Sequence, residues 1–171
     1  WTVKNLKKKK EKLLIGAGNN VKKYISQIEN FIDKRNPLVV SLNMNRFLSP
    51  KFIDYYIACD QTRIILESYD YLSLSNYLIV PFSRVESGIK KKFKKINICD
   101  YGLKIGDNNF QTINKNGCIL KKPLAIAYAL SFANASNARN ILFAGMDGYS
   151  KNDFNKIIMH ELFNEYKLKD L

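Results

Sequence analysis

Short apolar runs alternate with amphipathic segments along most of this 171-residue chain. The run "LLIGAG" starts after a lysine-rich stretch and stops at glycines, which predicts a buried parallel strand at about 12–16. Apolar residues then recur every three or four positions over 20–34, as in a helix packed on a sheet. The run "LVVSL" predicts a second strand at 38–42, so this part of the chain forms a βαβ unit with a right-handed crossover.

The same alternation continues with weaker signals. Strands are predicted at 55–59, 76–82 and 96–102, and helical segments at 61–69 and 83–95. Strands and helices that alternate within one unit are typical of doubly wound proteins. The pattern therefore predicts an α/β fold, a single Rossmann-like three-layer domain with a mainly parallel sheet and helices on both faces.

The last third of the chain changes character. Residues 103–118 carry Asn, Gly and Asp among polar neighbours, which predicts a loop. The Ala-rich segment 119–134, with Pro123 near its start, predicts a helix that is buried over most of its surface. A strand, "NILFAG", then ends in a Gly-Met-Asp-Gly turn. A last helix is predicted from the apolar spacing of Phe154, Ile157, Ile158 and Leu162.

The composition fits one well-cored domain over residues 1–171, because 46% of the residues are hydrophobic. No apolar stretch is long enough to span a membrane and no signal-peptide pattern is present, so we expect a cytoplasmic protein. The chain opens on Trp1 rather than Met. We therefore expect residues 1–11 to be a basic lead-in cut from a longer polypeptide, whose N-terminal domain would be a partner of this one.

The net charge of +13 fits an anionic partner. Joint enrichment in Lys, Asn and Ile is also typical of an AT-rich genome, so composition alone explains part of the charge. Lys greatly outnumbers Arg and no aromatic-plus-basic motif of an RNA or DNA module is present, so nucleic acid is not the expected partner. A small phosphorylated ligand or a nucleotide-sugar fits better.

Residues that could carry covalent or metal chemistry are few. Cys59, Cys99 and Cys118 are widely spaced and lack a CxxC pair, which predicts reduced, partly buried thiols rather than disulfides or a zinc site. His160 is the only histidine and lies on the predicted last helix. The sequence therefore indicates no metal site, no cofactor beyond a possible nucleotide or nucleotide-sugar ligand, and no identifiable catalytic residue.

Ligands of doubly wound sheets bind at the carboxyl ends of strands, near the switch in strand order. Small residues before a helix let an anion approach backbone N–H groups. This predicts a phosphate-binding turn that contains Gly16, Ala17, Gly18, Asn19 and Asn20. A plain strand-to-helix turn capped by Asn is the alternative. A dinucleotide site is disfavoured, because Val21 replaces the third glycine and the second strand ends at Asn43 rather than at an acid.

Four other side chains are candidate ligand contacts. The Asn43 amide can donate to and accept from a sugar or a base, and the neighbouring Arg46 has a donor fork that suits phosphate. Asp147 would bind a ribose, hold a metal or act as a base, or would instead cap the following helix. Tyr149 offers a hydroxyl to a phosphate.

Two stretches, "LLIGAGNNVKKY" and "KKPLAIAYALSFANASNARNILFAGMDGY", together resemble the family 42 sialyltransferases and archaeal pterin pyrophosphokinase-like proteins. In those proteins the first motif reads G-x-G-P-S-L and holds the phosphate of a nucleotide or nucleotide-sugar such as CMP-sialic acid. The resemblance implies such a role for Gly16, Gly18 and Asn20, and a ligand contact for Asn43. Asn19 and Asn20 replace the Pro-Ser pair, and the transferases' catalytic histidine has no counterpart.

A similar domain is attached to HMG-CoA-lyase-like aldolases, often called 4-hydroxy-2-oxovalerate aldolases, in surface-polysaccharide synthesis. The resemblance thus implies a nucleotide- or sugar-phosphate-binding domain of a larger enzyme of glycan synthesis. One alternative is a non-catalytic interaction or oligomerisation domain. Another is a stand-alone sialyltransferase-like glycosyltransferase.

Overall fold

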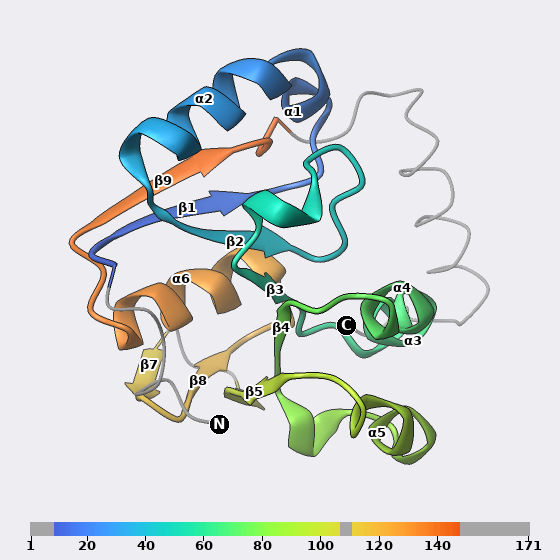
Figure 1. Cartoon of the computed structure of the whole chain (residues 1–171). Coiled ribbons are helices and arrows are strands. Elements are labelled where there is room, and N and C mark those ends of the chain that lie inside the picture. Colours follow the sequence, from blue (N-terminus) through green and yellow to red (C-terminus); the bar gives the residue numbers. More distant parts are fainter. Residues whose placement is uncertain (1–8, 107–110, 148–171) are drawn as a thin grey trace.

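A computed structural model describes residues 9–106 and 111–147 of the chain (Figure 1). Six strands build the main sheet, and the four central ones are short apolar runs of the kind that favours a buried parallel strand. In chain order they are β1 (Glu11–Ile15), β2 (Leu38–Leu42), β3 (Tyr55–Ile57), β4 (Tyr77–Val80), β5 (Ile98–Asp100) and β9 (Asn140–Ala144).

The main sheet is parallel throughout, in the order β5-β4-β3-β2-β1-β9. The chain starts at β1, moves strand by strand to β5, and then returns to place β9 on the other side of β1. Leu13 is thus in register with Val39 of β2 on one side and with Leu142 of β9 on the other. The reversal of strand order lies between β1 and β9, where doubly wound proteins bind ligands.

One face of the sheet is covered by helices from the first two thirds of the chain. Their buried side chains, such as Val21, Ile32 and Phe93, pack on inward-facing strand residues in a single apolar cluster. Figure 1 shows this layer above and to the right of the sheet. Its helices are α1 (Asn19–Lys23), α2 (Ile25–Arg35), α3 (Gln61–Leu66), α4 (Ser68–Leu72) and α5 (Ser87–Phe93).

The other face is covered by α6 (Ala125–Ala135) and by a small second sheet. Tyr128 and Phe132 of α6 are fully buried in a second apolar cluster together with Tyr101 and Cys118. Figure 1 shows α2 and α6 on opposite sides of β1 and β9. The described residues therefore form the predicted α/β, Rossmann-like arrangement of three layers, with helices on both faces of a parallel sheet.

The prediction of a loop at 103–118 was wrong, because most of this segment contributes strands to a second sheet. It consists of β6 (Gly102–Ile105), β7 (Gln111–Asn114) and β8 (Gly117–Leu120), in the order β6-β8-β7. Buried Cys118 and Leu120 alternate along β8 and pack beneath α6, so tertiary burial overrides the polar composition. The helix predicted from the Ala-rich segment, with Pro123 in its first turn, is confirmed but begins later, at Ala125, and residues 119 and 120 at the start of that segment belong to β8.

Other predicted features are confirmed with small changes of bounds. The helix expected over 20–34 is divided at Tyr24, whose φ of −114° and ψ of 27° interrupt it between α1 and α2. All three cysteines are free, as expected, and are more deeply buried than the partial burial that was predicted. None of the helices within residues 9–106 and 111–147 has the length and apolar character needed to cross a bilayer. The predicted last helix, with His160, lies outside the described residues.

A candidate ligand-binding cleft at the switch in strand order

The turns after β1 and β9 meet at the carboxyl edge of the sheet. The N–H of Gly16 donates to the carbonyl of Ala144 at 2.9 Å, and the N–H of Gly18 donates to the carbonyl of Gly145 at 3.1 Å. A Cβ on Gly16 would lie 2.4 Å from the carbonyl oxygen of Gly145. Both glycines are therefore required by the close approach of these two turns, whatever ligand binds there.

Asp147 occupies the start of α1. One carboxylate oxygen accepts the N–H of Asn20 at 3.2 Å, and a Cβ on Gly18 would lie 2.1 Å from the other. The N–H groups of Gly16, Gly18 and Asn20, which were expected to hold a phosphate, thus already donate to acceptors of the protein itself. Asp147 was expected to bind a ligand or to cap the helix that follows it in the chain, whereas its described contact is with the start of α1, an earlier helix.

Beside these turns lies an open cleft of about 790 Å³. Its floor includes the backbone of residues 16–18, and its polar side chains are Asn43, after β2, and Arg63, on α3. Much of its wall is apolar, formed by Leu42, Leu124, Ile126, Leu130, Phe143 and Met146. A concave, largely apolar space with a few convergent polar groups is the usual form of a small-molecule site.

Asn43 has an unusual environment within this cleft. Its φ of +59° lies in the left-handed region, which Asn tolerates better than most residues. Its N–H donates to the carbonyl of Ile57, and its carbonyl accepts the hydroxyl of Ser41. The side-chain Oδ1 is buried and has no hydrogen-bond partner among the described residues. Because a buried acceptor without a donor is costly, a ligand N–H or O–H that reached this atom would be bound favourably.

Arg63 is the cleft residue that the sequence reasoning missed. Asp60 caps α3 by accepting the N–H of Arg63 at 2.9 Å, which sets the arginine in the first turn of the helix after β3. Its Nε donates to Glu67 at 3.1 Å, and its side chain is 21% exposed, so the guanidinium is held but still reaches the cleft. The sequence did contain one indication of this role, because Arg63 follows closely after the strand predicted at 55–59.

The start of α6 also borders the cleft through Leu124, Ala125 and Ile126. No side chain caps this helix and its first turn contains no acidic residue. The first N–H groups of a helix have no intrahelical partner, and they lie at the positive end of its dipole. Arg63 and the start of α6 together make this side of the cleft favourable for a negatively charged group.

The remaining predicted site residues lie elsewhere. Arg46 is not among the residues that line the cleft, and its Nη2 pairs with Asp70 at 2.8 Å on the surface. Asn19 and Asn20 are exposed and likewise do not line it. Tyr149 lies outside the described residues.

Asn45, two residues after Asn43, connects two of the loops at the carboxyl edge of the sheet. Its Nδ2 donates to the carbonyl of Gly16 at 2.9 Å, and its Oδ1 accepts the N–H groups of Phe47 and Leu48 at 2.9 and 3.0 Å. The side chain is buried, so these bonds tie the loop after β2 to the turn after β1.

We expect Asn45→Ala to lower the free energy of unfolding by about 2 kcal/mol, because three backbone groups lose their partner, two of them in the buried residues Gly16 and Leu48. Urea denaturation followed by circular dichroism measures the change. Asn97→Ala is the matched control, because Asn97 is exposed and makes one long bond to Ser75 at 3.3 Å. Equal losses in the two variants would contradict the role assigned to Asn45.

The described cysteine thiols are not activated as nucleophiles. Burial raises the pKa of the Cys59 thiol well above its ordinary value, and burial raises the pKa of Cys99 to about 11. A thiol with a raised pKa stays protonated and is a poor nucleophile at neutral pH. Within residues 9–106 and 111–147, no group of three His, Cys, Asp or Glu side chains is placed to hold a metal.

Comparison of the chain with protein-family models, curated proteins and solved structures finds no match. The structural class of the protein is therefore assigned from its fold and from the cleft. The chain forms a Rossmann-like α/β domain with an open cleft at the reversal of its strand order.

Proposed function

We propose that this domain binds a nucleotide or a sugar phosphate in the cleft between β1, β2 and α6. The observation that carries the proposal is the convergence of Arg63, the uncapped start of α6 and the unpartnered Oδ1 of Asn43 on one cleft at the switch in strand order. Cationic groups and helix N-termini favour phosphate, and a buried amide oxygen favours a hydroxyl or amino group.

In this proposal the phosphate binds on the Arg63 side of the cleft, because the N–H groups of Gly16, Gly18 and Asn20 are already used by the protein. The sugar or base then lies towards β9, with Asn43 accepting one of its N–H or O–H groups. The apolar side chains of Phe143 and Met146, exposed by 49% and 41%, would cover the remaining surface of the ligand.

The wider role is proposed from the resemblance of the two glycine-containing segments to sialyltransferase-like and aldolase-associated proteins. We propose that the domain serves a larger enzyme of glycan or surface-polysaccharide synthesis, with an aldolase or a glycosyltransferase as the parent activity. The reaction itself is assigned to other parts of that enzyme.

The test is thermal unfolding of the chain with CMP, UMP, GMP, AMP, their sugar conjugates and simple sugar phosphates. A ligand at a hundred times its Kd stabilises the folded state by about 2.7 kcal/mol, which raises the Tm of a domain of this size by roughly 5–10 °C. We expect at least one nucleotide or sugar phosphate to do so.

Two variants locate the site. Asn43→Gly removes the amide and keeps a residue that tolerates the φ of +59°, and Arg63→Gln removes the cation; each should weaken binding at least about tenfold. Arg46→Gln is the matched control, because it removes an arginine that lies outside the cleft. No Tm shift with any ligand of the panel would contradict the proposal and favour the interaction domain, for which the exposed Leu124, Phe143 and Met146 would be the docking surface.

A further inference from the structure

A dense group of lysines covers the outer surface of α5, far along the sheet from the cleft. We call it the α5 lysine patch, and it consists of Lys90, Lys91, Lys92, Lys94 and Lys95. Ile89 and Phe93, four residues apart, are buried and fasten the helix to the core. Lys91, Lys92, Lys94 and Lys95 are exposed, and Lys90 is half-buried, with its Nζ donating to the carbonyl of Ser83 at 2.9 Å.

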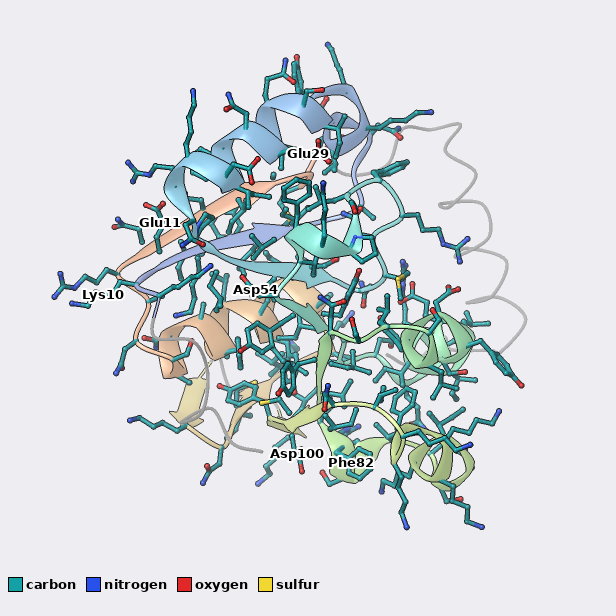
Figure 2. The ribbon with its side chains drawn as sticks, in the orientation of Figure 1. Lys10, Glu11, Glu29, Asp54, Phe82 and Asp100 are labelled. Atoms are coloured by element: carbon teal, nitrogen blue, oxygen red, sulfur yellow. The ribbon has the colours of Figure 1, made fainter. Side chains whose placement is uncertain are left out.

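The neighbouring carboxylates offset the charge of the α5 lysine patch only in part, since Glu86 interacts electrostatically with Lys92 alone among its lysines. Glu86 caps α5 through the N–H groups of Gly88 and Ile89, and these bonds lower the pKa of its carboxyl. Asp100, next to Phe82 in Figure 2, accepts the N–H of that residue. Of the described carboxylates, none lies within ion-pair distance of a lysine of this patch.

The acidic side chains of the adjacent helix α4 are also engaged elsewhere. Asp70 pairs with Arg46 at 2.8 Å, and Glu67 pairs with Arg63 and accepts the hydroxyl of Tyr71. The surface made by α4 and α5 therefore has a strong excess of positive charge.

Exposed apolar side chains lie on α3 and α4, the two helices that precede α5 in the chain. Ile65 and Leu66 at the end of α3 and Tyr69 of α4 have exposed fractions of 41%, 52% and 72%. The Nζ of Lys92 lies 4.6 Å from the ring centroid of Tyr69, so the lysine patch and the exposed residues of α4 are in contact at this point. Figure 1 shows α3, α4 and α5 next to one another on the same side of the molecule.

We infer that this surface binds the face of an anionic lipid bilayer. Lysines attract anionic headgroups, while Ile65 and Leu66 enter the boundary between headgroups and acyl chains and Tyr69 lies at the interface. Nucleic acid would use the positive charge and stack on Tyr69, but it offers no apolar surface to two exposed aliphatic side chains beside the lysines. The combination of lysines with aliphatic residues is what selects the lipid surface.

The test is co-sedimentation of the whole chain with vesicles of phosphatidylcholine, with and without phosphatidylglycerol. We expect binding only to the anionic vesicles, weakened by salt. Each lysine near an anionic surface contributes about a fivefold increase in partitioning, so Lys91→Gln with Lys94→Gln should lower partitioning about 25-fold. Leu66→Ser should lower it by about fivefold without a change of charge.

The matched control is the pair Lys22→Gln and Lys34→Gln on α1 and α2, where both lysines are exposed. This pair removes the same charge from another part of the surface and should change partitioning less than about twofold. Equal loss in both pairs, equal binding to neutral vesicles, or binding to an oligonucleotide in place of vesicles would each overturn the inference.

Discussion

Replacing Gly145 by alanine should lower the free energy of unfolding by at least about 3 kcal/mol. Gly145 has a φ of +68°, which costs an L side chain about 1–2 kcal/mol. A Cβ at this position would also lie 2.3 Å from Cγ2 of Val21 and 2.9 Å from the carbonyl oxygen of Gly16. Val21 is fully buried and Gly16 belongs to the backbone of the facing turn, so neither can move freely.

The expected consequence is local separation of β9 and its turn from β1 and α1, as well as a lower midpoint of urea denaturation. Hydrogen exchange of the N–H groups of Gly16 and Gly18 reports the separation directly, because the first donates to the last residue of β9 and the second to the turn after it. Gly88→Ala is the matched control. A Cβ there meets only the carboxylate of Glu86, at 3.0 Å, and we expect a change within about 0.5 kcal/mol. A similarly small effect at Gly145 would show that the two turns do not pack as described.

Lys12→Met should raise the free energy of unfolding at pH 7 by about 2 kcal/mol. Lys12 lies in β1 with only 1% of its surface exposed, and burial lowers its pKa to about 8. Keeping the ammonium charged at pH 7 therefore costs about 3 kcal/mol relative to the unfolded chain, where the pKa is about 10.4. The bond from Nζ to the carbonyl of Ser136, 3.1 Å long, offsets about 1 kcal/mol of this cost.

The advantage of the methionine should disappear as the pH rises. Between pH 8 and about 10.4 the unfolded chain holds a proton on Lys12 that the folded chain has lost. The contribution of Lys12 therefore makes the free energy of unfolding of the parent protein rise with pH over this range. Burial raises the pKa of Cys99 to about 11 and acts with the opposite sign, because the unfolded thiol ionises first. The variant shares this effect, so the difference between the two unfolding free energies isolates Lys12.

Urea denaturation of both proteins from pH 6.5 to 10 measures that difference. Lys10→Met provides the control, because Lys10 is exposed and points away from the sheet in Figure 2. Its unfolding free energy should follow that of the parent protein at every pH. A constant difference between Lys12→Met and the parent protein across the range would contradict the assigned pKa.

Local signals were sufficient for most secondary elements. The strand at β1 follows from a short apolar run stopped by glycine, and α2 follows from apolar residues at helical spacing. The residues of β6 to β8 were read as a loop because Asn and Gly favour turns, although the buried Cys118 and Leu120 alternate as in a strand. Their side chains find a core only because α6 covers them.

Local sequence was a poorer guide to the candidate site. It directed attention to Gly16, Gly18 and Asn43, which border the cleft, and also to Arg46, which pairs with Asp70 on the surface. Arg63 was missed because its distance from the turn after β1 depends on the packing of α3 beside β3. Whether a side chain that follows β3 lies close to the turn after β1 depends on the order of the strands in the sheet.

The sequence alone thus determined the alternation of strands and helices and the need for small residues after β1, because both depend on neighbours within a few positions. Tertiary structure alone decided that β9 pairs with β1, that the carboxylate of Asp147 occupies the start of α1, and that Arg63 and α6 border one cleft. These features join residues more than twenty positions apart. Their contacts depend on the order in which buried strands pair, and no local pattern records that order.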